Sequence, residues 1–126
     1  MSMPAARVAA LALLLAFPQT AAAKDNPEIT VLFFTASWCE PCRAIDRVLE
    51  KLQRRNRKYV RVVNVDFDVA ADERARWGVE QIPVVIVLSR EGKLLLRADG
   101  ASRQTLNALE SGLAELIQRS RKRSPP

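Results

Sequence analysis

The pattern of apolar and polar positions along the first half of the chain predicts a strand, a helix and a second strand. Residues 29–35, ITVLFFT, form a continuous apolar and β-branched run, which is typical of a strand buried on both faces. An apolar stripe with helical spacing follows, made of Ile45, Val48, Leu49 and Leu52. Tyr59–Asp66 is predicted to be a second strand. We expect the helix to end near Arg55–Asn56, and the two strands, joined by a right-handed crossover, to be parallel.

The second half of the chain predicts a short helix, two strands and a long helix. The short helix is expected over Asp68–Trp77, with Gly78 just past its end. A third strand begins after Pro83, the turn REGK follows, and the fourth strand is KLLLRA at 93–98. Ser102 can cap the last helix, whose buried stripe is Leu106, Leu109, Leu113, Leu116 and Ile117. The predicted order is β-α-β-α-β-β-α, an α/β fold with a four-stranded mixed sheet and helices on both faces.

The first 23 residues have the layout of a secretory signal peptide. Arg7 provides a positive charge, Val8–Phe17 is an unbroken apolar run, and Ala21–Ala23 supplies small residues for cleavage. A membrane-spanning helix needs about 20 apolar residues, so we expect no stable span; an uncleaved N-terminal anchor is the alternative. Residues 24–28 then form a short linker, and the protein is expected to be exported, to a bacterial periplasm.

Length and charge set further bounds on the chain. Its 126 residues fit one domain, which we place at 29–118, and its formal net charge is +6. Much of the excess lies in two basic runs, one at 54–61 and one in a basic C-terminal tail at 119–126. Such runs could attract an anionic membrane surface or an acidic partner, but we favour a solvated surface and a frayed tail. No nucleic-acid partner is expected, because export separates the protein from nucleic acid.

Cys39 and Cys42 are the only cysteines, and their spacing allows three interpretations. As a structural staple the pair joins no distant segments and would contribute only about 2 kcal/mol. As a zinc site it lacks ligands, because the chain has no histidine and structural zinc usually takes four Cys or His ligands. Two thiolates could still hold Cu(I). A redox couple is favoured, because the pair follows a predicted strand and begins a predicted helix.

The redox interpretation gives each residue around the pair a role. Cys39, at the exposed leading edge of the helix, is the expected nucleophile, because a helix N-terminus favours a thiolate. Cys42 lies one turn inside and can resolve a mixed disulfide. Trp38 can shield the pair on one side. Arg43 adds a positive charge that favours the thiolate, whereas Glu40 opposes it.

Two segments of the chain resemble the thioredoxin superfamily. FFTASWCEPC at 33–42 looks like its active-site segment, and GVEQIPVVIVLSREGKLLLRADGA at 78–101 resembles the second half of its fold. The resemblance covers residues 29–118 and implies that the bond between Ile82 and Pro83 is cis and that Pro83 faces the cysteines. It also implies that the backbone of Ile82 pairs with an incoming substrate chain. A proline that simply begins a strand is the alternative for Pro83.

The chain departs from that family at several positions. Residues 24–28 leave no room for the optional first strand and helix, so the minimal four-stranded form is expected. Phe33 and Val62 stand where cytosolic members carry a buried Asp and a Lys, and Arg47 replaces a proline of the active-site helix. Both polar helpers of proton transfer at the buried cysteine are therefore absent. The CEPC sequence is similar to exported reductases that serve cytochrome c maturation, but this chain is too short for their central insert.

The expected function is an exported thioredoxin-like thiol–disulfide oxidoreductase that acts on protein or small-molecule disulfides without a cofactor. Pro41 before Cys42 and Ile82 before Pro83 resemble the reducing members, so we expect a monomeric reductase supplied by a membrane thiol-reducing partner. Glu80 is a candidate proton relay if it reaches the site. The alternatives are a non-catalytic binding protein that holds a partner or Cu(I), and a reductant specialised for cytochrome c maturation.

Overall fold

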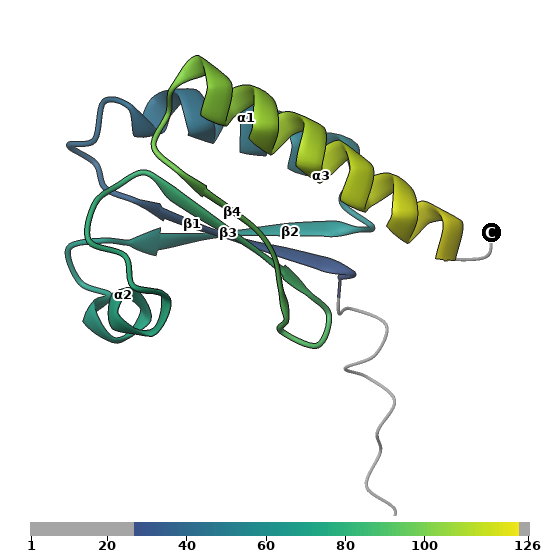
Figure 1. The fold of residues 1–126 in the computed structure, drawn as a ribbon, viewed down its shortest axis with the longest axis horizontal. Coiled ribbons are helices and arrows are strands. Elements are labelled where there is room, and N and C mark those ends of the chain that lie inside the picture. The colour runs from purple at the N-terminus through teal and green to yellow at the C-terminus, as the bar shows by residue number, and fades with distance from the viewer. Residues whose placement is uncertain (1–26, 124–126) are drawn as a thin grey trace, which may run out of the picture.

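The computed structural model describes residues 27–123, and its elements follow the predicted order (Figure 1). The expected signal peptide at 1–23 and most of the linker at 24–28 lie outside the described residues, as do residues 124–126. The elements are β1 Ile29–Thr35, α1 Cys42–Arg55, β2 Val60–Asp66, α2 Ala71–Trp77, β3 Val84–Ser89, β4 Leu94–Asp99 and α3 Arg103–Arg123.

The four strands form one mixed sheet in the order β2-β1-β3-β4. β1 and β2 are parallel, with Ile29 opposite Val60 and Thr35 opposite Asp66. β3 runs antiparallel to β1, and β4 runs antiparallel to β3. The predicted four-stranded mixed sheet is confirmed for the described residues. Because β1 and β2 are parallel, their carboxyl ends meet at one edge, and the chain continues from that edge into α1.

The core has two layers, one on each face of the sheet. α1 and α3 cover one face and α2 covers the other (Figure 1). Phe33 and Phe34 are both fully buried and point to opposite faces. Phe33 belongs to the cluster under α1 and α3 that contains Cys39 and Cys42, whereas Phe34 packs in the smaller cluster under α2. The prediction of a first strand buried on both faces is confirmed.

The short helix α2 begins at Ala71, later than the predicted start at Asp68. Asp66 delays it, because the N–H of Asp68 donates to Asp66 Oδ1 at 3.0 Å and the N–H of Ala70 donates to the Asp66 carbonyl at 2.9 Å. The bond to the Asp66 side chain forms a turn that competes with the helix, and Ala70, with φ −95° and ψ 56°, is not helical, so the regular helix begins after it. The predicted end is confirmed, since Gly78 adopts a left-handed φ of 61° just past Trp77.

The long helix α3 continues to Arg123, so the prediction of a frayed tail from residue 119 is wrong for residues 119–123. The extra turn packs against the domain: Ser120 is buried, and the guanidinium of Arg121 donates to Asn56 Oδ1. Arg119 also pairs with Glu115 at 2.6 Å, one turn earlier. Within residues 27–123, no helix is long and apolar enough to cross a membrane.

Two local features position α3 on the sheet. Ser102 caps the helix as predicted, because its Oγ accepts the N–H of Thr105 at 3.1 Å. Gly112 lies against the edge strand β4, where an added Cβ would lie 3.0 Å from Cδ2 of Leu96. Glycine costs a helix interior about 1 kcal/mol relative to alanine, and here it allows α3 to approach β4 closely.

Candidate active site

The segment between β1 and α1 carries the two cysteines. The N–H of Cys39 donates to the Ala36 carbonyl at 3.1 Å, and the N–H of Arg43 donates to the Glu40 carbonyl at 3.1 Å. Pro41 occupies the N-cap position with φ −60°, a value that its ring allows. No side chain caps the helix. These short turns place Cys42 as the first residue of α1, directly at the carboxyl end of β1.

Cys39 and Cys42 form a disulfide, with Sγ atoms 2.09 Å apart and Cα atoms 5.3 Å apart. The backbone N–H of Cys42 donates to Sγ of Cys39 at 3.2 Å. This N–H is one of the unpaired donors at the start of a helix, and it bears part of the positive end of the helix dipole. After reduction the same donor can stabilise a thiolate at Cys39, which supports the predicted division of roles between the cysteines.

The disulfide is less accessible than the sequence predicted. Cys39 is 5% exposed and Cys42 is 3% exposed, so the expectation that Cys39 lies at an exposed edge is wrong for the oxidised protein. The reason is that its sulfur is bonded back to Cys42, above the apolar cluster that includes Phe33. A cavity of about 250 Å³ nevertheless reaches the pair; it is lined by Thr35, Ala36, Ser37, Cys39, Cys42, Arg43 and Asp46.

The charged side chains around the pair largely offset one another. Nε of Arg43 lies 3.5 Å from a carboxylate oxygen of Glu40, and both side chains are more than half exposed. An exposed pair of this kind contributes little net field, so the helix terminus is the main source of positive potential at Cys39. Asp46, which was not predicted from the sequence, lines the same cavity. Its spacing of four residues from Cys42 on a helix was the available signal.

Trp38 is held toward the loop after β2. Its Nε1 donates to Asp68 Oδ2 at 2.9 Å, and its ring meets Phe67 edge-on at 6.4 Å. Phe67 is in turn covered by the guanidinium of Arg74, which lies 4.0 Å from the centre of the Phe67 ring. Trp38 remains 62% exposed and does not line the cavity at the disulfide. The contact of Asp68 with Trp38 was not predicted from the sequence. It could have been, because Trp38 follows β1, Asp68 follows β2, and the carboxyl ends of parallel strands lie at the same edge of the sheet.

The segment before β3 lies against the apolar cluster that contains Cys39 and Cys42. The peptide bond between Ile82 and Pro83 is cis. Ile82 is half-buried and packs against the apolar cluster that contains both cysteines. Pro83 is buried, and its carbonyl accepts the N–H of Gly100 at 2.8 Å. The fold therefore joins the loop that precedes β3, the loop that follows β4 and the cysteine segment at one end of the sheet.

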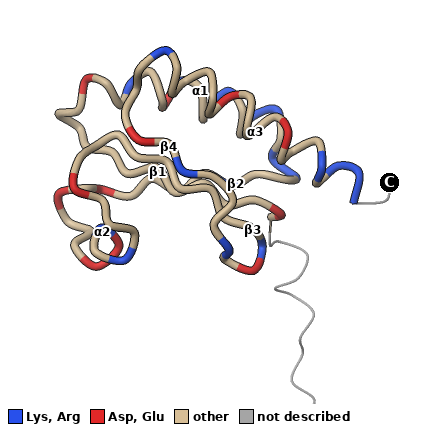
Figure 2. The backbone as a smooth tube through the Cα atoms, viewed as in Figure 1, with Lys and Arg blue, Asp and Glu red and all other residues tan. Residues whose placement is uncertain are grey.

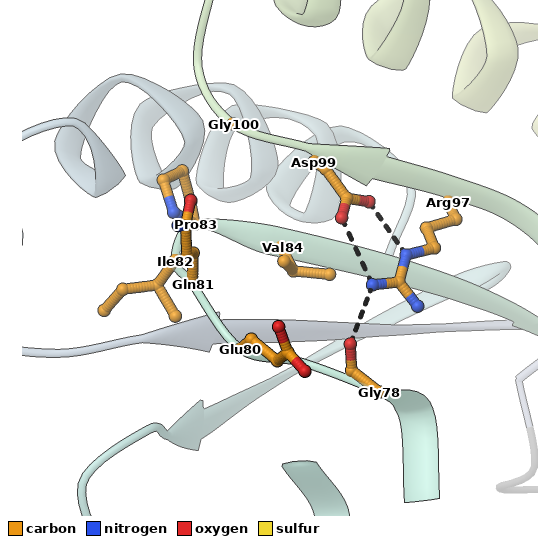
Figure 3. Close-up of a pocket in the computed structure, with 9 residues that line it drawn as sticks. All are labelled: Gly78, Glu80, Gln81, Ile82, Pro83, Val84, Arg97, Asp99 and Gly100. Carbon is orange, nitrogen blue, oxygen red and sulfur yellow. Dashed lines mark hydrogen bonds and ion pairs between the residues drawn. The ribbon is translucent and has the colours of Figure 1, made fainter. Parts of the chain in front are cut away.

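Glu80 lies in a different cavity from the cysteines. This cavity, about 360 Å³ in volume, adjoins Pro83 and is drawn in Figure 3. Arg97 spans it, with Nε 2.8 Å from a carboxylate oxygen of Asp99 and a second nitrogen 3.4 Å from the carbonyl of Gly78. The hydrogen bond to Asp99 raises the pKa of Arg97. Glu80 is exposed and is not among the residues that line the cavity at the disulfide, so the predicted relay gains no support from this arrangement.

Reduction of the disulfide is expected to change the free energy of unfolding by about 2 kcal/mol or less. The bond closes a short loop inside one turn of chain, so it restricts the unfolded state only slightly. Urea melts of the oxidised protein and of the protein held in excess reductant measure the difference. A reduced protein that fails to fold would instead support a structural staple.

Comparison with known proteins gives the family. The family model described as Thioredoxin matches residues 16–115. A Thioredoxin H-type of Fagopyrum esculentum is 36% identical over 84 residues, which cover 67% of this chain and 71% of that protein. The crystal structure of thioredoxin from Trypanosoma brucei brucei has a TM-score of 0.62 and 32% sequence identity, covering 75% of this chain and 80% of that one.

Other relatives are larger. A TPR repeat-containing thioredoxin of Arabidopsis thaliana is 33% identical over 88 residues, and the match covers 70% of this chain but only 23% of that protein. The similarity therefore concerns the domain built on the Cys39–Cys42 segment. By family model, sequence and three-dimensional structure, this chain belongs to the thioredoxin family.

Proposed function

We propose that this protein is an exported thiol–disulfide oxidoreductase that reduces disulfides of protein substrates. The Cys39 thiolate attacks one sulfur of a substrate disulfide, forms a mixed disulfide and releases the first substrate thiolate. The thiolate of Cys42 then attacks Sγ of Cys39, which releases the second substrate thiolate and forms the Cys39–Cys42 disulfide. The N–H of Cys42 directed at Sγ of Cys39 carries the proposal, because it favours the sulfur that must attack first.

The electrostatics of the site favour the reducing direction. A strongly oxidising pair is one whose reduced form is stabilised, chiefly through its thiolate. Here the helix terminus stabilises the thiolate without help from a histidine, since the chain has none. The positive charge of Arg43 is largely offset by its pairing with Glu40. Phe33 adds an apolar wall behind the pair. With so little stabilisation of the thiolate, the oxidised form is comparatively stable, and the reduced protein tends to pass its electrons to other disulfides.

Two surfaces beside the cysteines are suited to a substrate chain. Ile82 is held against the cysteine cluster, and Pro83 is fixed by its bond to Gly100, so the backbone before β3 presents a constant edge for pairing. Trp38 adds an exposed aromatic surface that the hydrogen bond to Asp68 holds in place. An extended polypeptide with an accessible disulfide fits this arrangement better than a small thiol compound.

The proposed function is tested by turnover of a protein disulfide. The wild-type protein, supplied with dithiothreitol, should accelerate the reduction of insulin, and it should be reduced only in a strongly reducing glutathione buffer. No acceleration would contradict the oxidoreductase function. Faster oxidation of a reduced, unfolded protein than reduction of insulin would reverse the direction that we propose.

The other candidate functions receive less support. Among residues 27–123, no group of three or more His, Cys, Asp or Glu side chains is placed to hold a metal ion. Between β2 and β3 the chain forms only the seven-residue helix α2, so the insert typical of reductases for cytochrome c maturation has no counterpart here. Cu(I) held by the two thiolates alone needs no third ligand, so it remains the alternative. We do not extend the proposal to the role in cytochrome c maturation.

Export is part of the proposal, and it predicts a mature protein that begins at Lys24. The support is the apolar run at 8–17 followed by Ala21–Ala23. A periplasmic reductase also needs a membrane partner that supplies electrons, because that compartment is kept oxidising. Intact-mass measurement of the protein recovered from a secreting bacterium checks the cleavage. A mass that retains residues 1–23 would indicate an anchor.

A further inference from the structure

The structure brings the two basic runs of the sequence to the same end of the domain. The first run covers the end of α1 and the start of β2, and the second is the last turn and a half of α3. All nine of their basic side chains are exposed. We call them the basic face: Arg54, Arg55, Arg57, Lys58, Arg61, Arg119, Arg121, Lys122 and Arg123.

Direct contacts join the two halves of this face. Arg121 of α3 donates to Asn56, the residue that ends α1. Two cations approach the ring of Tyr59: the guanidinium of Arg121 lies 5.8 Å from the ring centre, and Nζ of Lys58 lies 5.6 Å from the same ring centre. Residues more than sixty positions apart in sequence therefore form one continuous surface. Figure 2 shows the basic last turn of α3 at the end of the molecule where the described chain finishes.

Little negative charge interrupts the basic face. Neither 53–61 nor 116–123 contains an acidic residue. Glu115 borders the face and pairs with Arg119. On the turn after β3, a backbone hydrogen bond lowers the pKa of Glu91, and a hydrogen bond to Ser89 and the charges of Arg90 and Arg123 act in the same direction. Glu110 also lines a cavity with Arg55. The nine basic residues outnumber these neighbouring carboxylates, so most of the positive charge is uncompensated and directed at solvent.

The chemistry of the face suits lipid headgroups better than a protein partner. Stable protein interfaces have an apolar centre surrounded by polar residues. In the described part of the chain the exposed large apolar residues are Trp38, Val69, Leu94 and Leu95, and none of them belongs to the basic face. A surface of exposed Lys and Arg without such a centre is suited to anionic headgroups, which bind through charge alone.

The position of the face would orient the protein. α1 runs from Cys42 to Arg55 over 14 residues, so the disulfide and the basic face are separated by about 20 Å along the helix. Pro27 shares a cavity with Arg57 and Arg61, so the chain enters the domain at the basic end. The active-site cavity opens at the other end of α1, where it stays accessible when the basic end is covered.

We propose that the basic face binds the anionic surface of a membrane and leaves the Cys39–Cys42 edge free to meet its substrates. Each Lys or Arg close to such a surface contributes about 1 kcal/mol, which corresponds to about a fivefold change in affinity. Because the attraction is between exposed charges, raised salt should weaken it. This inference does not depend on the direction of the redox reaction, but it rests on the proposed export, which keeps the basic face away from nucleic acid, the other polyanion that such a surface could bind.

Vesicle sedimentation with the full-length oxidised protein tests the proposal. The vesicles are phosphatidylcholine alone, or phosphatidylcholine mixed with anionic phosphatidylglycerol. Any binding through the apolar segment at 8–17 should occur on both kinds, so the gain on anionic vesicles reports positive charge, and the variants below assign it to the basic face. The expected result is a clear preference for anionic vesicles that salt reverses, with insulin reduction unchanged on binding.

Matched variants separate the face from net charge. Arg57→Gln with Arg61→Gln, or Lys122→Gln with Arg123→Gln, should each weaken binding to anionic vesicles by about 25-fold, the product of two fivefold effects. The control removes two exposed arginines elsewhere, Arg76→Gln with Arg103→Gln, and should weaken binding by less than about threefold, since only long-range attraction is lost.

Three outcomes would overturn the proposal. The first is equal binding to neutral and anionic vesicles. The second is a control variant that weakens binding as much as the two variants of the face, which would leave only net charge as the cause. The third is stronger binding to polyglutamate than to anionic vesicles at equal accessible charge, which would identify an acidic protein as the partner instead.

Discussion

Replacement of Cys39 by serine should abolish the reduction of protein disulfides. A serine hydroxyl is not ionised near neutral pH, and the N–H of Cys42 would then face an oxygen that cannot attack a disulfide. We expect insulin reduction to fall by at least about a thousandfold, to the uncatalysed rate, as for the loss of other catalytic nucleophiles. Turnover of insulin with dithiothreitol as electron donor is the measurement.

Cys42→Ser is the matched variant, because it makes the same replacement of sulfur by oxygen at the other cysteine of the pair. It should keep the first attack and stop at a mixed disulfide between Cys39 and the substrate. Mass spectrometry should therefore find covalent adducts with Cys42→Ser and none with Cys39→Ser. The reverse pattern would show that Cys42 is the attacking residue, in conflict with the direction of the hydrogen bond at the helix terminus.

Replacement of Phe33 by aspartate should have the second largest effect, and it should act on stability and rate in opposite directions. Phe33 is fully buried in the cluster that contains Cys39 and Cys42. Loss of the ring removes about 3–5 kcal/mol from the free energy of unfolding, and burial of a carboxyl group adds to the loss. The apolar site raises the pKa of that carboxyl, so it becomes a base suited to neutral pH.

The rate effect should appear in the resolving step. Cys42 must lose its proton before it attacks the mixed disulfide, and the apolar wall of Phe33 provides no acceptor. An aspartate there should accelerate the decay of the mixed disulfide by about tenfold or more near neutral pH. Stopped-flow measurement of that decay against pH is the test, on protein shown by urea melts to be folded.

Phe34→Asp is the natural control for this prediction. Phe34 is the next residue of β1 and is equally buried, but it points to the other face of the sheet, away from the cysteines. It should lose similar stability without any gain in rate. Asp46→Asn and Glu80→Gln then ask which existing carboxylate takes the proton; only Asp46 lines the cavity at the disulfide. If Phe33→Asp leaves the decay unchanged, proton transfer does not limit the reaction.

Hydrophobic periodicity predicted the strands and the two longer helices of this fold, because each of these helices buries an apolar stripe and the strands bury apolar residues that can be recognised within each segment of sequence. Residues 29–35 have no polar face, which predicted a strand covered on both sides, and the structure confirms it through Phe33 and Phe34. The Cys39–Cys42 spacing between a strand and a helix indicated redox chemistry, because helix termini stabilise thiolates wherever they occur. These are local properties, which neighbouring residues determine.

The features that the sequence did not predict depend on contacts between distant residues. Asp66 delays α2 through its own turn, and Asp68 holds Trp38 only because the parallel pairing of β1 and β2 brings their ends together. Cys39, bonded to Cys42, is buried above a cluster of residues that are distant in sequence, and this cannot be inferred from a spacing.

By itself, the sequence determined the order of the elements, the minimal mixed sheet and the cysteine pair at the start of a helix. Only the tertiary structure decided that residues 119–123 are helical and that two basic runs form one surface. The reason is physical: the charges of each run are exposed and direct no folding, so their meeting follows from how α3 packs on the sheet. The buried stripe of α3, formed by Leu109, Leu113 and Ile117, and the close approach of Gly112 to Leu96 fix that packing, and both bring together residues far apart in the chain.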